Sequence, residues 1–309
     1  MRPNRMDHRT LVASLTPEER AALTRPANVP GIIRLTLHGG IIVGNGWLII
    51  ERVPMWPLLM IVQGVAIIFL FTVLHETVHR TAFKERWLND AVARLCGFLV
   101  VLPADWFRCF HFAHHRFTQD SERDPELAEP KPRTLGAYLA HVSGLPVWWN
   151  QLKTLVRNAL GRRTDPFVSG SEAGKVRWEA RMMIAAYGLA ATGSLAAGSA
   201  EILLVWLLPV VLGQPFLRLF LMAEHVGCIH EGNMLANSRT TLTSAVVRWL
   251  TWNMPYHAEH HALPSIPFFR LPAFHQIARS HLGVVGDGYL RFHANYLRHV
   301  VGSHQGSRG

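Results

Sequence analysis

The stretch Trp252-Asn253-Met254-Pro255-Tyr256-His257-Ala258-Glu259-His260-His261 places three histidines at positions i, i+3 and i+4. A helix with 3.6 residues per turn presents these positions on one face, whereas a strand would turn His260 away from His257 and His261. We therefore expect a helix that directs three imidazoles toward one point. The same spacing occurs earlier as His111-Phe112-Ala113-His114-His115, which indicates a shared metal centre.

Two further histidine groups follow apolar runs of the chain. The first is His75-Glu76-Thr77-Val78-His79, and the second is the single His225. Nine imidazoles exceed the four to six ligands of one ion, so two metal ions are predicted. Neutral imidazole suits iron, zinc, copper and nickel, and a nitrogen-rich site with open positions favours oxygen activation by ferrous iron over a closed structural zinc site. The predicted ligands are His75, His79, His111, His114, His115, His225, His257, His260 and His261.

The remaining histidines lack a spacing typical of ligands. His230, which follows His225 by five residues, stays undecided between ligand and ordinary residue. His38 lies within an apolar run, where we identify no partner for it. We assign the others to ordinary core or surface positions: His8, His141, His275, His281, His293, His299 and His304.

The composition indicates a membrane protein. Of 309 residues, 49% are hydrophobic and only 17% are charged, against about a quarter charged in soluble proteins. The net charge of +10 suits anionic lipid headgroups or an acidic partner protein. Nucleic acid is not an expected partner, because the chain shows no helix-turn-helix, zinc-finger or RNA-binding signature. The three cysteines form no C-x-x-C pair, which argues against a disulfide framework or an iron–sulfur site.

Long apolar runs predict an all-α integral membrane fold. We expect four transmembrane helices in two hairpins, with a helical cytosolic cap that carries the histidine groups. The expected spans are about 31–50, 57–75, 182–200 and 202–223, and the shorter run 88–104 is expected to be re-entrant or interfacial. The predicted division of the chain is an N-terminal cytosolic arm 1–30, a membrane domain 31–283 and a C-terminal tail 284–309.

Smaller features complete this prediction. Thr16 precedes Pro17, Glu18 and Glu19, a pattern typical of a helix start in the arm. The turns expected outside hold one arginine, Arg52, whereas the 105–180 segment holds many. Positive charge gathers on the cytoplasmic side of membrane proteins, so we expect the histidines to lie on that side.

Two other kinds of protein fit part of the pattern. The sequence His75-Glu76-x-x-His79 matches the zinc-protease helix in which two histidines bind zinc and the glutamate acts as general base. Such a protease needs one more ligand and a water, and six further grouped histidines are unexplained by it. A membrane protein with a purely structural metal is the other alternative.

The grouped histidines resemble the three histidine boxes of the membrane fatty acid desaturase and hydroxylase superfamily. The resemblance covers roughly residues 31–275 and extends to the words around the boxes: His111-Phe112-Ala113-His114-His115-Arg116-Phe117-Thr118-Gln119-Asp120, Asp124-Pro125-Glu126 and Asn253-Met254-Pro255-Tyr256-His257. The first box has three intervening residues, and Leu221 stands where acyl-CoA desaturases carry an asparagine one turn before the lone histidine. The chain therefore looks more similar to the acyl-lipid, sphingolipid or carotenoid-modifying branches.

The resemblance implies a non-haem di-iron centre on the nine histidines, with two Fe²⁺ ions and O₂ as co-substrate. The implied reaction is oxygen-dependent desaturation of a fatty acyl chain drawn from the bilayer, with hydroxylation or ketolation of a lipid or carotenoid as the alternative. Electrons would come from a separate ferredoxin, rubredoxin or cytochrome b5 type donor, because the chain has no H-P-G-G haem sequence. Glu76, Asp105, Asp120 and Glu259 are the predicted acceptors for imidazole N–H groups. The sequence does not predict the oligomeric state.

Overall fold

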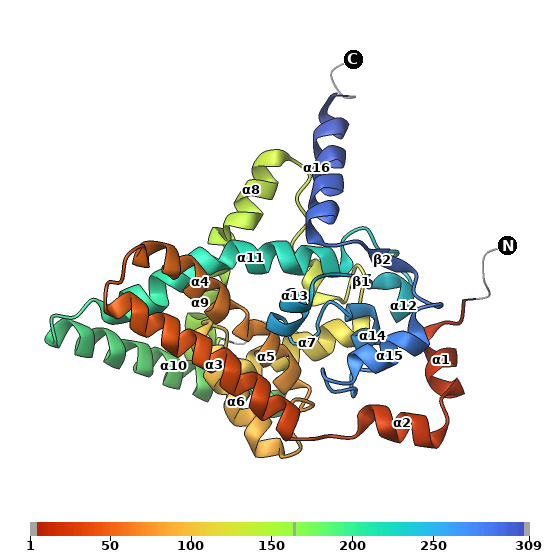
Figure 1. Ribbon diagram of the computed structural model, residues 1–309, viewed down its shortest axis with the longest axis horizontal. Coiled ribbons are helices and arrows are strands. Elements are labelled where there is room, and N and C mark those ends of the chain that lie inside the picture. Colours follow the sequence, from red (N-terminus) through yellow and green to blue (C-terminus); the bar gives the residue numbers. More distant parts are fainter. Residues whose placement is uncertain (1–4, 163–164, 306–309) are drawn as a thin grey trace.

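The computed structural model describes residues 5–162 and 165–305 of the chain. Helices make up nearly all of its regular structure (Figure 1). The helices of the first half are α1 (His8–Ser14), α2 (Pro17–Thr24), α3 (Val29–Ile50), α4 (Trp56–Ile68), α5 (Leu70–Val78), α6 (Arg86–Leu99), α7 (Ala104–Phe117), the 3₁₀ turn η1 (Pro125–Ala128), α8 (Leu135–Ser143) and α9 (Leu145–Ala159).

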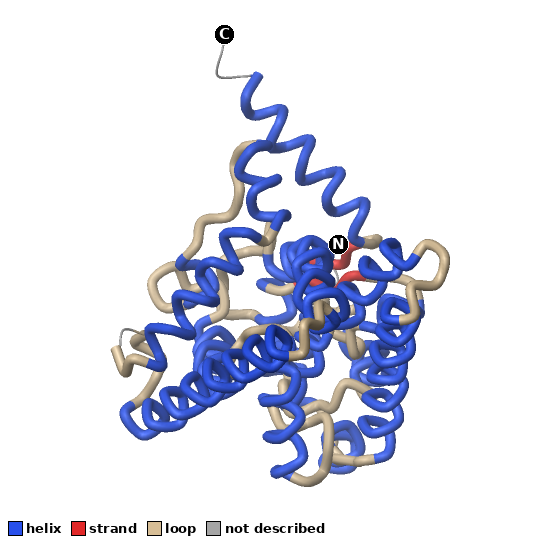
Figure 2. Tube along the Cα trace, turned by 90° about the vertical axis from the view of Figure 1, so that its left-hand side faces the viewer, coloured by secondary structure: helices blue, strands red, loops and turns tan. Residues whose placement is uncertain are grey.

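The second half adds further helices and two short strands. Its elements are α10 (Gly170–Ala196), the π-helical turn η2 (Leu203–Leu207), α11 (Leu208–His225), α12 (Met234–Asn237), β1 (Arg239–Thr241), α13 (Ala245–Leu250), α14 (His257–Ala262), α15 (Leu271–Ala278), β2 (Val284–Gly286) and α16 (Tyr289–Gln305). α12 to α15 and the strands gather beside α5 and α7, while α16 projects away from the rest of the molecule (Figures 1 and 2).

Three helical segments of the described chain are long and apolar enough to cross a membrane: Pro17–Ile50, Trp56–Val78 and Leu203–His225. They contain the predicted spans 31–50 and 57–75 and all but the first residue of 202–223. The pair α6 and α7 is bent by 102° and counts as a fourth segment only if both arms form one broken span. A re-entrant or interfacial segment was expected there, over 88–104, and the bend fits a re-entrant loop as well as a broken span.

Most of the predicted span 182–200 falls on helix α10. α10 begins at Gly170 and ends at Ala196, and it is not among the segments apolar enough to span. Its first half carries charged residues that include Glu179 and Arg181, and small alanines and glycines supply much of its second half. The span over 182–200 therefore stays a prediction, and the described chain has three segments that meet the criterion of length and composition, or four with the bent pair.

Close backbone contact joins α4 to α11. A Cβ atom added to Gly64 would lie 2.1 Å from the carbonyl oxygen of Pro209, and one added to Gly213 would lie 2.2 Å from the carbonyl oxygen of Gly64. Small residues let membrane helices approach this closely. The contact matters for the site because α4 leads directly into α5, which carries His75, and α11 ends at His225.

The mostly helical chain also contains one small sheet, which the sequence did not predict. β1 and β2 form a parallel two-stranded sheet in which Arg239 pairs with Val284. Three-residue strands are too short to show an alternating pattern. The pairing brings 284–286 out of the predicted C-terminal tail and into the body of the protein.

The two ends of the chain pack more firmly than a surface arm and a free tail. The predicted cap at Thr16 is confirmed, because its side chain and that of Glu19 form a reciprocal capping box. Leu11 and Leu23 are buried in the main hydrophobic core. At the other end, His293 of α16 contacts the carbonyl oxygen of Leu219 at 2.8 Å. His38, for which the sequence suggested no partner, has one in the structure. Its Nε2 atom lies 2.8 Å from the carbonyl oxygen of Ala66, so the contact joins α3 to α4.

Candidate metal centre

The first histidine pair is carried by α5. Thr72 and Thr77 bond back to carbonyl oxygens of the preceding turn, so the helix satisfies its own polar side chains in an apolar setting. α5 ends at Val78 with His79 as its C-cap, and the next residue, Arg80, has a left-handed φ of 62°. Arg80 then forms an ion pair with Asp90 of α6 at 2.8 Å. This pair holds the turn that follows the two histidines.

The second histidine group is carried by α7, whose N-terminus is capped from α10. The carboxylate of Glu179 accepts the backbone N–H groups of Ala104 at 2.9 Å and Asp105 at 2.7 Å. A carboxylate at a helix N-terminus satisfies free donors and complements the helix dipole. The cap fixes the start of the helix that presents His111, His114 and His115.

The third group lies on the short helix α14, which is positioned from both sides. Before it, Trp252 and Asn253 adopt left-handed φ angles of 50° and 60°, and the Asn253 side chain donates to the carbonyl oxygen of Phe268 at 2.9 Å. Within it, Glu259 accepts a hydrogen bond from Thr240 of β1 at 2.5 Å. Strained, non-glycine left-handed residues persist where surrounding contacts over-determine them.

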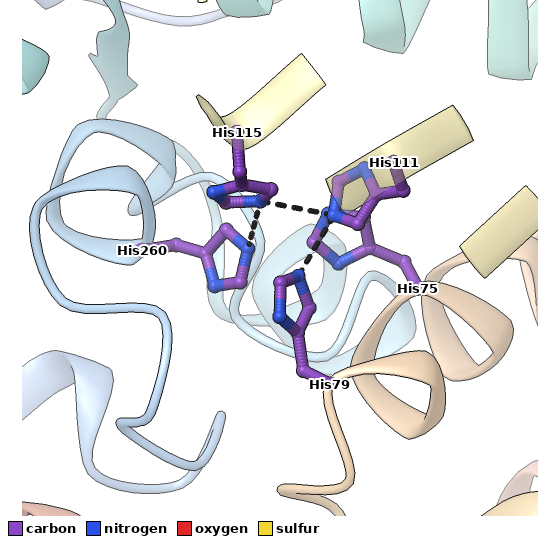
Figure 3. A group of neighbouring side chains, drawn as sticks. All are labelled: His75, His79, His111, His115 and His260. Atoms are coloured by element: carbon purple, nitrogen blue, oxygen red, sulfur yellow. Dashed lines mark hydrogen bonds between the residues drawn. The ribbon is translucent and has the colours of Figure 1, made fainter. Parts of the chain in front are cut away.

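The nine predicted histidines converge into two groups of possible ligands. Within each group, one ligand atom per residue lies within 4.8 Å of all the others. The first group, drawn in Figure 3, consists of His75, His79, His111, His115 and His260. The second group consists of His114, His225, His257 and His261.

The division between the groups corrects the expectation that each H-x-x-H-H helix serves one point. In α7, His111 and His115 join the first group, while His114 joins the second. α14 does the reverse, since His260 joins the first group and the other two join the second. Residues i and i+4 differ by only about 40° around a helix, whereas i+3 and i+4 differ by about 100°. Each helix therefore contributes to both groups.

The nitrogen atoms are spaced like neighbouring ligands of one ion. Nε2–Nε2 distances are 2.8 Å for His79–His111, 3.0 Å for His111–His115 and 3.1 Å for His115–His260. In the second group they are 3.1 Å for His114–His225 and 2.9 Å for His225–His257. Two nitrogens bound at about 2.1 Å and at right angles on one ion stand about 3.0 Å apart.

Unpartnered ring nitrogens provide a test of whether a metal fits. Both ring nitrogens of His75 and Nε2 of His261 are buried without a hydrogen-bond partner among the described residues. The Nε2 atoms of His111, His115 and His225 each face two neighbouring Nε2 atoms, although one such atom has a single site for donating or accepting. A cation at the centre of each group satisfies these nitrogens, so the residues fit metal binding.

Hydrogen bonds fix the ring orientation in the second group. Asp124 contacts Nδ1 of His114 at 2.9 Å, and the carbonyl oxygen of Asn237 contacts Nδ1 of His225 at 3.2 Å. The hydroxyl of Thr118 donates to the carbonyl of His114 and lies 3.2 Å from Nδ1 of His261, so it accepts there. These acceptors place the proton on Nδ1 and leave the Nε2 lone pair for a metal.

The four carboxylates predicted as acceptors have other roles in the described structure. Glu76 accepts the backbone N–H of Phe268 at 2.9 Å, Asp105 pairs with Arg94 at 3.2 Å, and Asp120 pairs with Arg123 at 2.5 Å. Glu259 bonds His275, a residue outside the nine that had been assigned to an ordinary position. Among the described residues, these contacts of the four carboxylates are with a loop, a neighbouring helix or His275, and none is with one of the nine histidines. The carboxylate that does contact one of the nine histidines is Asp124, at Nδ1 of His114. The sequence motif Asp124-Pro125-Glu126, which follows the second histidine group, could have identified it.

Burial keeps the imidazoles of α14 neutral. Burial, reinforced by neighbouring histidines, lowers the pKa of His257, His260 and His261 well below 6.5. Neutral imidazole is the metal-binding form. His230 belongs to neither group, because its Nδ1 contacts the carbonyl oxygen of Gln119 at 3.2 Å.

A large cavity reaches the histidines from the outside. Its volume is about 1210 Å³, and its wall includes His75, His111, His114 and His257. Aromatic and aliphatic side chains line much of the remainder, among them Phe71, Phe107, Phe110, Leu221 and Met222. The arrangement offers an apolar molecule a route to two adjacent metal-binding groups.

Comparisons with known proteins agree on one family. Residues 52–294 match the family model described as fatty acid desaturase. The chain is 22% identical over 265 residues to the "sn-1 oleoyl-lipid 12-desaturase" of Arthrospira platensis, which covers 78% of this chain and 75% of that protein. It is 30% identical over 113 residues to the protein of the same name in Synechocystis sp., which covers 34% and 32%. It is 25% identical over 120 residues to the "sn-1 acyl-lipid omega-3 desaturase (ferredoxin)" of Nostoc sp., which covers 35% and 33%.

Proposed function

The chain belongs to the fatty acid desaturase family, and from that membership we propose that it is an oxygen-dependent lipid desaturase that uses iron at both histidine groups. The observation that carries the proposal is the convergence of all nine histidines into two adjacent groups. His75, His79, His111, His115 and His260 would hold one iron. His114, His225, His257 and His261 would hold the other.

Bound iron would activate O₂, which is the oxidant of the reaction. With O₂, two electrons and two protons, two adjacent CH₂ groups become a CH=CH unit and two waters form. The protein's own part is positional: Asp124, the Asn237 carbonyl and Thr118 hold three rings with their Nε2 lone pairs inward. Phe71 and Phe107 line the cavity beside His75 and His111, where they exclude water from the reacting carbons.

The substrate is proposed to be a lipid that enters from the bilayer. Helix α9 forms one wall of the cavity through Asn150, Gln151 and Thr154. Its other face carries an exposed apolar stripe: Leu145, Trp149, Leu152, Val156 and the adjoining Leu160. A helix with these two faces lies in the membrane interface. A lipid chain would then pass beneath α9 toward the histidines.

The electron donor is proposed to be a separate protein of the ferredoxin, rubredoxin or cytochrome b5 type. The name of the Nostoc relative specifies ferredoxin for that protein. The net charge of +10 on this chain favours an acidic donor. By the arginine distribution, the donor would dock on the cytoplasmic side.

Lipid mass spectrometry of cells with and without the protein tests the proposed reaction. Desaturation removes two hydrogens from an acyl chain, whereas hydroxylation adds one oxygen. We expect the first product, and we expect His260→Ala to abolish it. The matched control is His299→Ala on α16, whose exposed ring contacts only the carbonyl of Asn295. Products that gain oxygen in the wild type, or an active His260→Ala variant, would contradict the proposal.

Glu76→Gln separates the oxygenase from the zinc-protease alternative. Glu76 is fully buried, accepts the Phe268 N–H and is absent from the cavity wall. Glutamine retains a carbonyl oxygen for that bond, so we expect desaturation to persist in this variant. A protease that used Glu76 as general base would lose its activity. Loss of desaturation in a variant that still binds two irons per chain would contradict the structural role of Glu76.

A further inference from the structure

The two histidine groups differ in the number of nitrogens that they offer. The first has five and the second has four. Leu221, one helical turn before His225 and on the cavity wall, offers no polar side-chain atom to the smaller group. If both groups bind the same ion, the second has one more position to fill from another side chain or from solvent.

A carboxylate stands beside that group. Oε2 of Glu126 lies 3.4 Å from Nε2 of His114, the nitrogen that faces the other ligands. The same 3₁₀ turn, η1, also presents Asp124, which contacts Nδ1 of His114 at 2.9 Å and accepts the backbone N–H of Glu126 at 2.9 Å. One turn therefore places an acidic side chain on each side of a single imidazole ring.

The position of the proton on His114 determines how its Nε2 atom interacts with Glu126. Asp124 accepts a hydrogen bond from the N–H at Nδ1 of His114. In the neutral form of His114, Nε2 then carries a lone pair and no proton. His225 also has its proton on Nδ1, because the partner there is a carbonyl oxygen. Oε2 of Glu126 and Nε2 of His225 both lie beside Nε2 of His114, at 3.4 Å and 3.1 Å. A cation next to these atoms, either a proton on Nε2 of His114 or a metal ion, offsets the repulsion between their lone pairs.

The distance fits a shared ion. Atoms bound at about 2.1 Å to one ion stand about 3.0 to 3.4 Å apart for angles between a right angle and the tetrahedral angle. Glu126 is not among the atoms that all lie within 4.8 Å of one another, so a rotation of its side chain is needed. The side chain is 30% exposed on the cavity side, which leaves room for that rotation.

We propose that Glu126 supplies the fifth ligand of the second metal, as a carboxylate oxygen bound beside His114, His225, His257 and His261. This inference rests on the proposed iron function. The other oxygen of Glu126 is 3.2 Å from Nζ of Lys131, which balances the charge of the carboxylate and limits its motion. The two metal positions then differ in kind: five imidazoles hold one, and four imidazoles and a carboxylate hold the other.

The test uses the full-length protein loaded with ⁵⁷Fe²⁺ in detergent, with iron content and Mössbauer spectra as readouts. We expect two irons per chain and two distinct quadrupole doublets in the wild type. Glu126→Gln should change one doublet, leave the other in place, and weaken binding of one iron about tenfold or more. Glu126→Asp, which keeps the charge, should restore iron content in part. Glu122→Gln is the matched control, because Glu122 lines the same cavity and forms no side-chain ion pair in the described structure.

The outcomes separate this inference from the proposed function. A folded Glu126→Gln protein with two irons and the wild-type spectrum overturns the ligand role and leaves the di-iron proposal intact. Equal change in both doublets, or the same change in Glu122→Gln, also overturns it. A wild-type protein that binds no iron contradicts the proposed function itself. If Glu126→Gln does not fold, Glu126→Asp decides: an unchanged spectrum and affinity in this shorter carboxylate refutes direct binding.

Discussion

Single hydrogen bonds determine how an imidazole presents itself to a metal, and Asp124 is the clearest case. Its two oxygens contact Nδ1 of His114 at 2.9 Å and the backbone N–H of Gln119 at 2.8 Å. Asp120 was the residue expected in this role, four positions earlier, yet it closes the following turn with Arg123. Proximity in the sequence therefore identified the loop that supplies the acceptor for His114, but it did not identify which carboxylate of that loop accepts the hydrogen bond.

Asp124→Asn should weaken iron binding by about tenfold to a hundredfold, the usual cost of losing an orienting partner. The new amide group can accept at only one position, so either His114 or Gln119 loses its acceptor. Titration of the iron-free protein with Fe²⁺ measures the change. Asp120→Asn is the control and should bind iron like the wild type. Equal affinities for Asp124→Asn and the wild type would show that Asp124 does not orient the ring.

Helix packing sets the distance between the histidine groups at the next scale. α4 and α11 touch through Gly64 and Gly213, and each helix leads to a histidine of a different group, His75 in the first and His225 in the second. Glycine is required at this crossing because any Cβ would overlap a backbone oxygen. Three of the four expected spans coincide with elements of the structure: α3 covers 31–50, α4 and α5 cover nearly all of 57–75, and η2 with α11 covers all but the first residue of 202–223.

Gly213→Ala should separate α4 from α11 and lower both stability and iron content. Overpacking of this kind costs about 1–3 kcal/mol, and here it also displaces His225 from the second group. Gly40→Ala on α3 is the matched control, because no atom lies within 4 Å of its added Cβ. Thermal unfolding in detergent and iron analysis measure both effects. Wild-type iron content and stability in Gly213→Ala would mean that the helix crossing does not set the site.

Burial of many histidines in one place makes the stability of the whole molecule depend on pH. His257, His260 and His261 are at most 3% exposed, and burial lowers the pKa of each well below 6.5. In the unfolded chain these groups return to a pKa of about 6.5. Below that pH the unfolded chain binds more protons than the folded protein, so stability falls as the pH decreases.

The iron-free protein should therefore unfold at a lower temperature at pH 5.5 than at pH 7.5. Each such histidine contributes up to about 1.4 kcal/mol per pH unit below its unfolded pKa, and the contribution is complete above it. Thermal unfolding in detergent at the two pH values measures the slope, and His260→Asn should reduce it. An unfolding temperature that does not decrease between pH 7.5 and pH 5.5 would contradict neutral burial of these rings.

The sequence by itself determined which nine histidines converge, the helical nature of the boxes and the family, because helical spacing and apolar runs are local properties of the chain. Only the tertiary structure decided that His114 leaves His111 and His115 to join His225, and that His260 crosses the other way. It also decided the short sheet, the cap that Glu179 of α10 forms on α7, and the position of Glu126 beside the second group. These features depend on contacts between residues far apart in the chain, such as His114 and His225, and no periodicity in the sequence records which distant faces will meet.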